Sequence, residues 1–538
     1  MYKKLQNLFI ILFTVLSIFL PATVFAADKP IILLYTNDIH CSIEDNIGFA
    51  KIARYKEDLT QFTPYVALID AGDAVQGAPI GKLSQGESIV NIMNAVGYDF
   101  AIPGNHEFDY GMNRFLELDN LLNCGYYSAN LINLNTGKNL LPAYKIMQFG
   151  DTKIALIGVT TPESLTSSTP AFFQDEHGKF IYSFAEDDTG KKLYAKIQQT
   201  VDTVKKQHAD YIILVAHLGE HGITPRWSSL AVARNTTGID IIIDGHSHET
   251  VLKDTVKNKQ GKDVIITQTG TKLNNLGHLA IEPDGKISVL LIADLSLSDP
   301  KIKALINEEK QKFAPILNQT IGKSEVNLTT IDPKNGKRLI RSGETNLGDF
   351  VTDAYKNVLD TDIALCNGGG IRNEIPASTF TYSDILTAFP FGNMCVIIEA
   401  TGQQILDALE MGAKDYPQEN GGFLQVAGLT YTIDSTIPSG IVTDDKGNFI
   451  KTEGAYRVQN VLINGKPLDL NKKYTVGGTS YILKLGGNGM TMFKNARLIQ
   501  DEMMSETDVI IEYIQNHLNA VIGDTYKNPY GSNRIIIK

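Results

Sequence analysis

The sequence predicts a mixed α/β protein made of two domains that a helix connects. Its 538 residues exceed one compact domain, because domains usually contain roughly 100–200 residues. Short apolar runs alternate with helical or polar stretches along both halves, a pattern typical of layered α/β domains. A glycine-free stretch with apolar residues at helical spacing, residues 301–318, separates the halves and predicts the connecting helix.

The first domain is predicted to span residues 27–298. Most of its apolar runs are continuous and not alternating, which is typical of strands that are covered on both faces. These predicted strands occupy residues 31–35, 65–69, 154–159, 211–215, 239–243 and 264–266, and a further short run occupies residues 98–102.

The connecting helix is predicted within residues 299–324 and the second domain within residues 325–538. The helix has apolar residues among charges at helical spacing, namely Ile302, Leu305, Ile306, Phe313 and Ile316. The second domain shows helical signals at 347–359 and 403–411 and turn-rich strands over much of 424–480. We therefore expect a second α/β domain there.

The composition is that of an ordinary globular chain, 43% hydrophobic and 20% charged, which disfavours collagen-like, disordered and polytopic membrane proteins. The net charge is −11, from 49 Lys and Arg against 60 Asp and Glu. Without a basic excess, no global field attracts nucleic acid, and we expect no nucleic-acid partner. An acidic protein can still bind a small phosphorylated substrate where a local cation or a few arginines outweigh the net field.

Residues 1–26 are predicted to be a signal peptide. Lys3 and Lys4 precede an apolar run over residues 8–20, which is too short to span a bilayer comfortably. Val24 and Ala26 are small residues at the positions that a signal peptidase reads. The alternative is an uncleaved N-terminal anchor. We expect an exported, soluble mature chain that is secreted, cell-surface associated or periplasmic.

The four cysteines, Cys41, Cys124, Cys366 and Cys395, are far apart and form no C-x-x-C motif. Four cysteines allow three pairings, among which the sequence does not choose. So few cysteines in so long a chain cannot be the main source of its stability. Free buried thiols and two disulfides are both open alternatives.

Polar side chains follow the predicted strands of the first domain, at the point where each strand ends. In an α/β sheet, the carboxyl ends of the strands are where functional sites are assembled. A single such residue is more often a turn or a helix cap, but the joint occurrence of five such strand ends predicts a metal site. The motifs are N-D-I-H (37–40), G-D (72–73), G-N-H-E-F-D (104–109), A-H (216–217) and G-H-S-H (245–248).

The donor types indicate the metal chemistry. Imidazole, carboxylate and amide oxygen without a thiolate cluster suit Zn, Mn, Fe or Co. The donors are more numerous than one tetrahedral ion needs, which predicts two divalent ions that share a bridging carboxylate. Two such ions can ionise a water and hold the oxygens of an in-line phosphoryl displacement.

These motifs resemble those of the calcineurin-like metallophosphatases, and the continuation E-F-D-Y-G (107–111) resembles the 5′-nucleotidase branch in particular. The second half is similar to the 5′-nucleotidase C-terminal domain in N-L-G-D (346–349), N-G-G-G-I-R (367–372), P-F-G-N (390–393) and G-G-N-G (486–489). The resemblance covers nearly the whole mature chain. It implies a four-layered α/β/β/α first domain and a second, substrate-binding domain.

The resemblance also implies roles for residues of the first domain. One ion, with Zn, Mn or Co as the implied metals, would be held by Asp38, His40, Asp73 and His248, and the other by Asp73, Asn105, His217 and His246. His106 would contact the phosphoryl group, with Asp109 orienting and charging its ring. Considered alone, that pair could also be a capping Asp beside a structural His.

In the second domain, the resemblance implies the substrate contacts. Arg372, after glycines that include Gly369, would bind the phosphate, assisted by Asn367 and Arg341. Phe391 and Tyr481 would stack on the base, and Asn488 would meet the ribose. Two features depart from the family: Asn488 stands where Asp is usual, and Tyr481 lies one residue further upstream than the usual aromatic.

The predicted function is therefore an exported, dinuclear metal-dependent hydrolase. It would release nucleoside and phosphate from 5′-nucleotides by attack of a metal-activated hydroxide. Two alternatives use the same site, on 2′,3′-cyclic nucleotides or on nucleotide-sugar diphosphates. A third is a non-catalytic secreted nucleotide-binding protein, which predicts a missing ligand or a replaced His106, and neither is seen. The sequence specifies neither the metal nor the oligomeric state.

Overall fold

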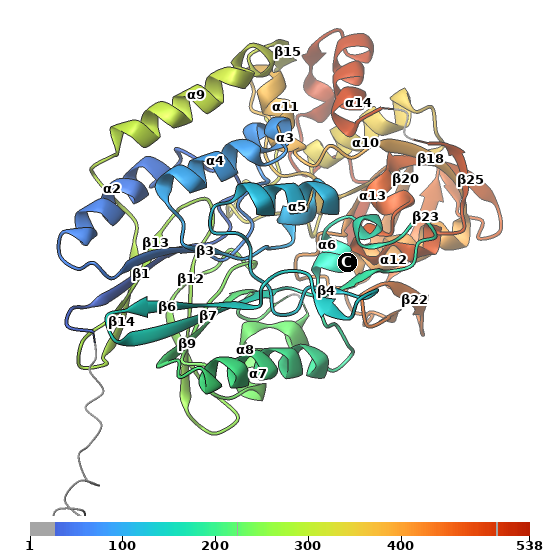
Figure 1. The fold of residues 1–538 in the computed structure, drawn as a ribbon. Helices are drawn as coiled ribbons and strands as arrows, with labels where there is room; N and C mark the ends of the chain where they lie inside the picture. Colours follow the sequence, from blue (N-terminus) through green and yellow to red (C-terminus); the bar gives the residue numbers. More distant parts are fainter. Residues whose placement is uncertain (1–26, 223, 502–503) are drawn as a thin grey trace, which may run out of the picture.

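The computed structural model describes residues 27–222, 224–501 and 504–538, and the predicted signal peptide lies outside them. Two α/β parts lie side by side, the first drawn in blue to green and the second in yellow to red (Figure 1). The predicted mixed α/β class is confirmed. None of the helices in the described part of the chain is long and apolar enough to cross a membrane.

The first part contains two sheets whose central strands are parallel. One sheet has the order β14 (Ile287–Ile292), β13 (Leu276–Ile281), β1 (Ile31–Thr36), β2 (Val66–Asp70) and β3 (Phe100–Ala101). The other has the order β11 (Thr250–Lys257), β12 (Asp263–Thr269), β10 (Ile241–Ile243), β9 (Tyr211–His217), β7 (Thr152–Thr160) and β6 (Tyr144–Phe149).

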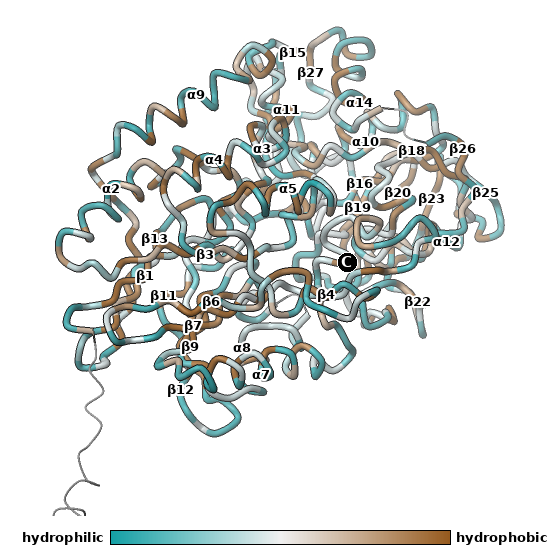
Figure 2. Tube along the Cα trace, in the orientation of Figure 1, coloured by the Kyte–Doolittle hydropathy of each residue, from teal (hydrophilic) through white to brown (hydrophobic). Residues whose placement is uncertain are grey.

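The two sheets pack face to face and helices cover their outer faces. Along β1, side chains alternate between the two faces of the strand, so that Leu33 lies in the core between the sheets and Leu34 in the core under the helices. Helices α2 (Phe49–Thr60), α4 (Glu87–Val96) and α5 (Met112–Leu121) cover the first sheet, and α7 (Lys191–Lys206) and α8 (Ser229–Asn235) cover the second. The implied four-layered α/β/β/α arrangement is therefore present. In Figure 2, strands β1, β7 and β9 are drawn largely in brown, the colour of hydrophobic residues.

The predicted connecting helix is α9 (Pro300–Leu317). It begins at Asp299, whose side chain accepts hydrogen bonds from the backbone N–H groups of Lys301 and Ile302 at 2.7 and 3.1 Å. Such an N-cap satisfies backbone donors that have no partner within the helix. Ile302 and Ile306 are buried against the helices of the first part. The exact domain boundaries remain a prediction.

The second part has a five-stranded sheet and a four-stranded sheet. The first has the order β19 (Leu424–Ala427), β16 (Ile363–Asn367), β25 (Lys473–Thr479), β18 (Cys395–Thr401) and β26 (Arg497–Gln500), and the second the order β24 (Lys466–Pro467), β23 (Val458–Ile463), β20 (Leu429–Ile433) and β28 (Ile535–Ile537). Helices α10 (Asn346–Val358) and α14 (Glu506–Glu512) pack on one face of the five-stranded sheet, and α12 (Gly402–Ala413) on the other. The helices predicted at 347–359 and 403–411 correspond to α10 and α12.

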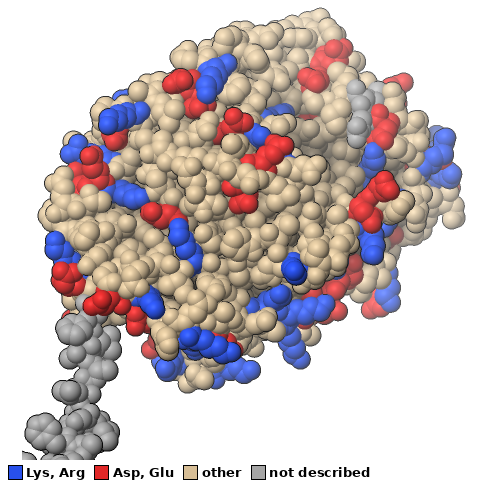
Figure 3. All heavy atoms as spheres, in the orientation of Figure 1, with Lys and Arg blue, Asp and Glu red and all other residues tan. Residues whose placement is uncertain are grey.

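The four cysteines are all free thiols in the structure, so that the alternative of two disulfides is not the one observed. Three are buried and Cys124 is half-buried. On the surface, basic and acidic side chains are intermixed over the face seen in Figure 3. Packing of apolar layers, and not cross-linking, therefore holds the fold together.

Candidate metal centre

The predicted metal ligands all lie at the carboxyl ends of parallel strands. Asp38 and His40 follow β1, Asp73 follows β2 and Asn105 follows β3. In the second sheet, His217 is the last residue of β9, while His246 and His248 follow β10. The two sheets thus bring their strand ends to one place, which is the arrangement that the sequence predicts.

The loops that carry these residues have unusual backbone conformations. A non-glycine residue with positive φ is uncommon, and a cluster of them is typical of functional sites. Five of the predicted ligands have it: Asp38 (50°), His40 (49°), Asp73 (61°), His246 (85°) and His248 (59°). Between the loops, a Cβ on Gly72 would lie only 2.6 Å from the backbone nitrogen of Gly104. The close approach of these loops therefore requires a glycine at position 72.

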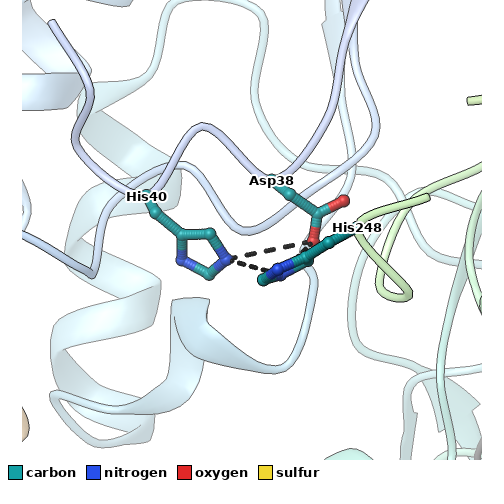
Figure 4. A group of neighbouring side chains, drawn as sticks. All are labelled: Asp38, His40 and His248. Carbon is teal, nitrogen blue, oxygen red and sulfur yellow. Dashed lines mark hydrogen bonds and ion pairs between the residues drawn. The ribbon is translucent and has the colours of Figure 1, made fainter. Parts of the chain in front are cut away.

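The first group of donors consists of Asp38, His40 and His248, which point toward one another (Figure 4). The Nε2 atoms of His40 and His248 are 3.0 Å apart, and Asp38 Oδ1 lies 3.3 Å from His248 Nε2. His40 Nδ1 is 3.0 Å from the carbonyl of Gln76. Because a carbonyl oxygen only accepts a hydrogen bond, Nδ1 carries the proton. In the neutral ring, Nε2 then has a lone pair that can bind a metal. Burial and the neighbouring His248 lower the pKa of His40 well below its ordinary value, which favours this neutral ring.

The second group consists of Asp73, His217 and His246. His217 Nδ1 is held by the carbonyl of Ala71 at 2.7 Å, while its Nε2 lies 3.0 Å from Asp73 Oδ2. Burial alone would lower the pKa of His217, but the carboxylates of Asp73 and Asp38 raise it to about 10. The carboxylates thus attract a positive charge to this point. A bound cation would take the place of the proton, as metal binding to histidine releases protons.

Two of the predicted ligands have a buried polar atom that makes no hydrogen bond: Asn105 Oδ1, and His217 Nε2, which lies 3.0 Å from Asp73 Oδ2 without forming one. Buried polar atoms are normally satisfied, and an exception needs an explanation such as an ion. Asp73 lies between the two groups, with Oδ2 3.0 Å from His217 Nε2 and 4.0 Å from His40 Nε2. The nitrogen and oxygen donors present therefore fit two divalent cations of the Zn, Mn, Fe or Co type with Asp73 shared between them.

His106 and Asp109 form a close pair beside the first group. His106 Nδ1 lies 2.6 Å from Asp109 Oδ2, and the ring of His106 lies 5.3 Å from that of His40. Burial alone would lower the pKa of His106, but the carboxylates of Asp109 and Asp73 raise it above its ordinary value. These carboxylates favour the protonated ring, which could donate a hydrogen bond from Nε2.

Two buried glutamates support this site, and our sequence analysis gave neither of them a role. Glu107 accepts hydrogen bonds from the backbone of Asp73, Ala74 and Gly104 at 2.6–2.8 Å and so fixes two of the ligand loops. Glu163 Oε2 lies 2.7 Å from His246 Nε2. The available signal for Glu163 was its place just after the predicted strand 154–159, like the ligands themselves.

The second part brings Arg372 and Phe391 to His106. The Arg372 guanidinium lies 5.6 Å from the centre of the Phe391 ring, and that ring lies 5.8 Å from the ring of His106. Burial and the nearby Arg338 lower the pKa of Arg372, while Asp73, Asp109 and Asp38 act in the opposite direction. The two parts therefore face each other across the candidate centre, and Arg372 lies in the field of its carboxylates.

Arg341 is a cation without a hydrogen-bond partner at its buried Nε atom. Burial and the neighbouring Arg372 lower its pKa to about 9. Arg338, which the sequence analysis did not single out, adds to the positive field and forms an ion pair of 3.3 Å with Glu419. An anionic group of a substrate would relieve the repulsion among these arginines.

The other residues predicted to contact the substrate lie at the end of β16, in α13 (Ser480–Leu483) and in neighbouring turns. Asn367, the last residue of β16, donates from Nδ2 to Asn488 Oδ1 at 3.1 Å. Gly369 is packed closely against Gly421. Tyr481 packs on Gly487, where a Cβ would lie 2.4 Å from its ring. Its hydroxyl donates to the carbonyl of Thr166, in the first part, at 2.8 Å. Tyr481 therefore contacts both parts of the protein.

A buried carboxyl group, Glu506, lies where the two parts meet. It accepts weak hydrogen bonds of 3.3–3.4 Å from Asn393 and Tyr355, and the facing cation is Lys82 of the first part, which donates to Thr507 at 3.1 Å. Burial raises the pKa of Glu506 to about 7, in spite of Lys82.

Glu506→Gln is expected to stabilise the protein at pH 8 and to have little effect near pH 4.5. The folded-state pKa is above the ordinary value of 4.5. Folding therefore takes up a proton, and stability falls as the pH rises from about 4.5 to about 7. The difference between variant and parent should reach roughly 2–3 kcal/mol above pH 7. Thermal unfolding of chelator-treated protein across this pH range measures it, and a difference independent of pH would contradict the prediction.

Fold and site together define a phosphoesterase, with Asp, Asn and His donors at strand ends and arginines facing them. Residues 32–250 match the calcineurin-like phosphoesterase family, and residues 320–495 match the 5′-nucleotidase C-terminal domain. The chain belongs to the 5′-nucleotidase family and is a phosphoric ester hydrolase. The predicted resemblance is thus confirmed.

Known proteins are similar over nearly the whole chain. A 5′-nucleotidase from Bos taurus is 26% identical over 92% of this chain and 90% of its own length. A trifunctional nucleotide phosphoesterase protein, YfkN, from Bacillus subtilis is 26% identical over 91% of this chain and 34% of its own length. The crystal structure of a 5′-nucleotidase precursor from Thermus thermophilus is 26% identical, with a TM-score of 0.78 over 94% of this chain and 99% of that one.

Proposed function

We propose that this protein is an exported, dinuclear metal-dependent hydrolase that releases phosphate from 5′-nucleotides. The observation that carries the proposal is the pair of donor groups around Asp73, faced by His106 and Arg372. Carboxylate and imidazole donors suit divalent cations, and the facing cationic side chains suit a phosphate. The family membership and the relatives named 5′-nucleotidase support a nucleotide as the substrate.

The seven predicted ligands would divide between two cations that share Asp73. One cation would be held by Asp38, His40, Asp73 and His248, and the other by Asp73, Asn105, His217 and His246. When bound, these cations would lower the pKa of an attacking water and neutralise charge on the phosphoryl oxygens. The metal could be Zn, Mn or Co.

The chain's own side chains would bind and polarise the phosphate. His106 would donate from Nε2 to a phosphoryl oxygen, while Asp109 holds Nδ1 at 2.6 Å and keeps the ring protonated. Arg372 would donate two parallel hydrogen bonds to the same group, with Asn367 and Arg341 beside it. Donors fixed in advance stabilise the charge that develops on these oxygens in the transition state.

The nucleoside would bind between the aromatic rings of the second part. Phe391 and Tyr481 would grip the base by stacking, and Asn488 would accept a hydrogen bond from the ribose. Asn488 has a positive φ of 51°, a conformation that Asn tolerates better than most residues. The substitution of Asn for Asp therefore keeps the backbone and an acceptor but removes a charge. Oligomeric state stays outside this proposal.

Other nucleotide phosphoesters are the second candidate, on the same site. The match to a trifunctional nucleotide phosphoesterase, of which this chain covers 34%, supports further nucleotide phosphoesters as substrates. The two that the sequence analysis leaves open are 2′,3′-cyclic nucleotides and nucleotide-sugar diphosphates. The hydrolase family and the complete set of ligands, with His106 present, do not support the non-catalytic alternative.

Removal of metal is expected to abolish turnover. We expect the purified protein to hydrolyse AMP and to lose at least about a hundredfold in rate with a chelator, because several kcal/mol of charge stabilisation depends on the cations. Refilling with Zn, Mn or Co should restore the rate. The same assay on 2′,3′-cyclic AMP and UDP-glucose ranks the alternatives. Turnover that a chelator leaves unchanged would contradict the proposal.

A further inference from the structure

The segment of residues 163–168 touches three separate groups of the proposed site. It follows β7 and contains the short helix α6 (Ser164–Ser167). Neither the metal ligands nor the predicted substrate contacts belong to it. Its side chains and carbonyls nevertheless contact a metal ligand, the orienting partner of His106, and the predicted base-stacking residue of the second part.

The first contact fixes the ring of His246. Glu163 Oε2 accepts from His246 Nε2 at 2.7 Å, and Glu163 Oε1 accepts from the backbone of Thr224 at 2.6 Å. A carboxylate only accepts hydrogen bonds, so the proton of this bond lies on His246 Nε2. Because Nε2 carries the proton, Nδ1 of His246 has the lone pair and is the atom that would bind a metal. Such outer carboxylates orient metal-binding histidines and increase their basicity.

The second contact reaches His106 through Asp109. Ser168 is 1% exposed, and its hydroxyl donates to Asp109 Oδ1 at 3.0 Å. The other carboxylate oxygen of Asp109 holds His106 Nδ1 at 2.6 Å. With both of its oxygens held, the Asp109 carboxylate has one orientation, and so has the ring of His106.

The third contact comes from the second part. The hydroxyl of Tyr481 donates to the carbonyl of Thr166 at 2.8 Å and lies 3.4 Å from that of Ser167. A phenylalanine would keep the stacking face but could not make this bond. The turn that carries Gly487 also packs against α6. The segment is therefore anchored by the same residue that is proposed to stack on the base.

We propose that residues 163–168 are a positioning segment that links Tyr481 to His246 and to the Asp109–His106 pair. The inference rests on the proposed function, because it assigns this segment to the same metal and phosphate site. Glu163 and Ser168 are its positioning residues, and neither touches the substrate. Tyr481 thereby acts on the reacting groups through its hydroxyl, in addition to any stacking of its ring.

Glu163→Gln tests the contact between the segment and the candidate metal ligand His246. Glutamine has one acceptor oxygen where the carboxylate uses two, so either His246 or Thr224 loses its partner. We expect the variant to hold metal about 10- to 100-fold more weakly in a titration with a chelator. Glu410→Gln is the matched control, because Glu410 is a buried carboxylate that accepts from two backbone N–H groups of the second part. Equal metal retention in the two variants would contradict the positioning role of Glu163.

Tyr481→Phe tests the hydrogen bond between Tyr481 in the second part and Thr166 in the first. We expect kcat to fall about three- to tenfold, the scale of one lost hydrogen bond, on both AMP and ribose 5-phosphate, which has no base. Tyr431→Phe is the control, since the Tyr431 hydroxyl also donates to a carbonyl, that of Leu424. In this control, kcat should not change.

Ser168→Ala should lower kcat with little effect on KM, and its effect should not add to that of Tyr481→Phe.

The outcomes separate this inference from the proposed function. If the parent protein binds metal and hydrolyses AMP but all three variants behave as their controls or as the parent, the positioning segment is wrong and the function stands. If the parent shows no metal-dependent turnover, the function itself fails. Should Glu163→Gln not fold, as judged by circular dichroism, the kcat values of Ser168→Ala and Tyr481→Phe decide the matter, and unchanged values overturn the inference.

Discussion

Asp73→Asn should lower kcat on AMP by at least about a thousandfold, because several kcal/mol of charge stabilisation depends on cations that share this carboxylate. Asp73 Oδ2 lies 3.0 Å from His217 and 4.0 Å from His40, one ring from each donor group. Its other oxygen accepts from the backbone of His106 at 2.8 Å. Asparagine has the same shape but no charge, so neither cation would be held normally.

Asp70→Asn is the matched control for this variant. Asp70 is the last residue of β2, the strand that Asp73 follows, and both side chains are buried. Burial and the nearby Glu107 raise its pKa well above the ordinary value, which favours its neutral form. Its partners are Thr36 and the backbone of Gly72. We expect this variant to retain kcat within about tenfold; similar rates for the two variants would contradict the shared role of Asp73.

His106→Asn should lower kcat by about a hundred- to a thousandfold, as is typical when one donor to a transition-state oxygen is removed. His106 is 8% exposed, enough to reach a bound group. Its ring lies 5.8 Å from that of Phe391 in the second part, and Arg372 lies against the same Phe391 ring. The metal content should stay that of the parent, because His106 belongs to neither donor group. Kinetics on AMP and elemental analysis of the same sample measure both quantities.

His278→Asn provides the comparison for His106. His278 lies on β13, with Nδ1 3.0 Å from the hydroxyl of Tyr55 and away from both donor groups. The loss of the His278 imidazole should leave kcat unchanged. A His106→Asn variant that loses metal would make His106 a ligand, and one with normal kcat would remove it from the chemistry.

The convergence of the candidate metal ligands was predictable from the sequence because these residues share a local signal. Each follows a continuous apolar strand, and the carboxyl ends of parallel strands converge whatever the details of packing. The six Asp and His residues among the candidate ligands accordingly lie in two groups of three, Asp38 with His40 and His248, and Asp73 with His217 and His246. The helix at residues 301–318 was predictable for a similar reason, since its apolar spacing is a local feature.

The supporting contacts were not predictable, since they depend on how distant segments meet. Glu163 and His246 are 83 residues apart in the chain, and the sequence around Glu163 does not indicate that His246 is its partner. The bond from Tyr481 to Thr166 spans 315 residues and two domains. Likewise, Asn488 meets Asn367 only because the turn after Leu485 packs at the end of β16. A single sequence contains no local pattern for such pairs.

The metal content of the purified protein tests the central claim most directly. After supplementation with Zn or Mn and removal of free metal, elemental analysis should find two ions bound per chain, because the two donor groups share Asp73. A protein that binds no transition metal under these conditions would contradict the account.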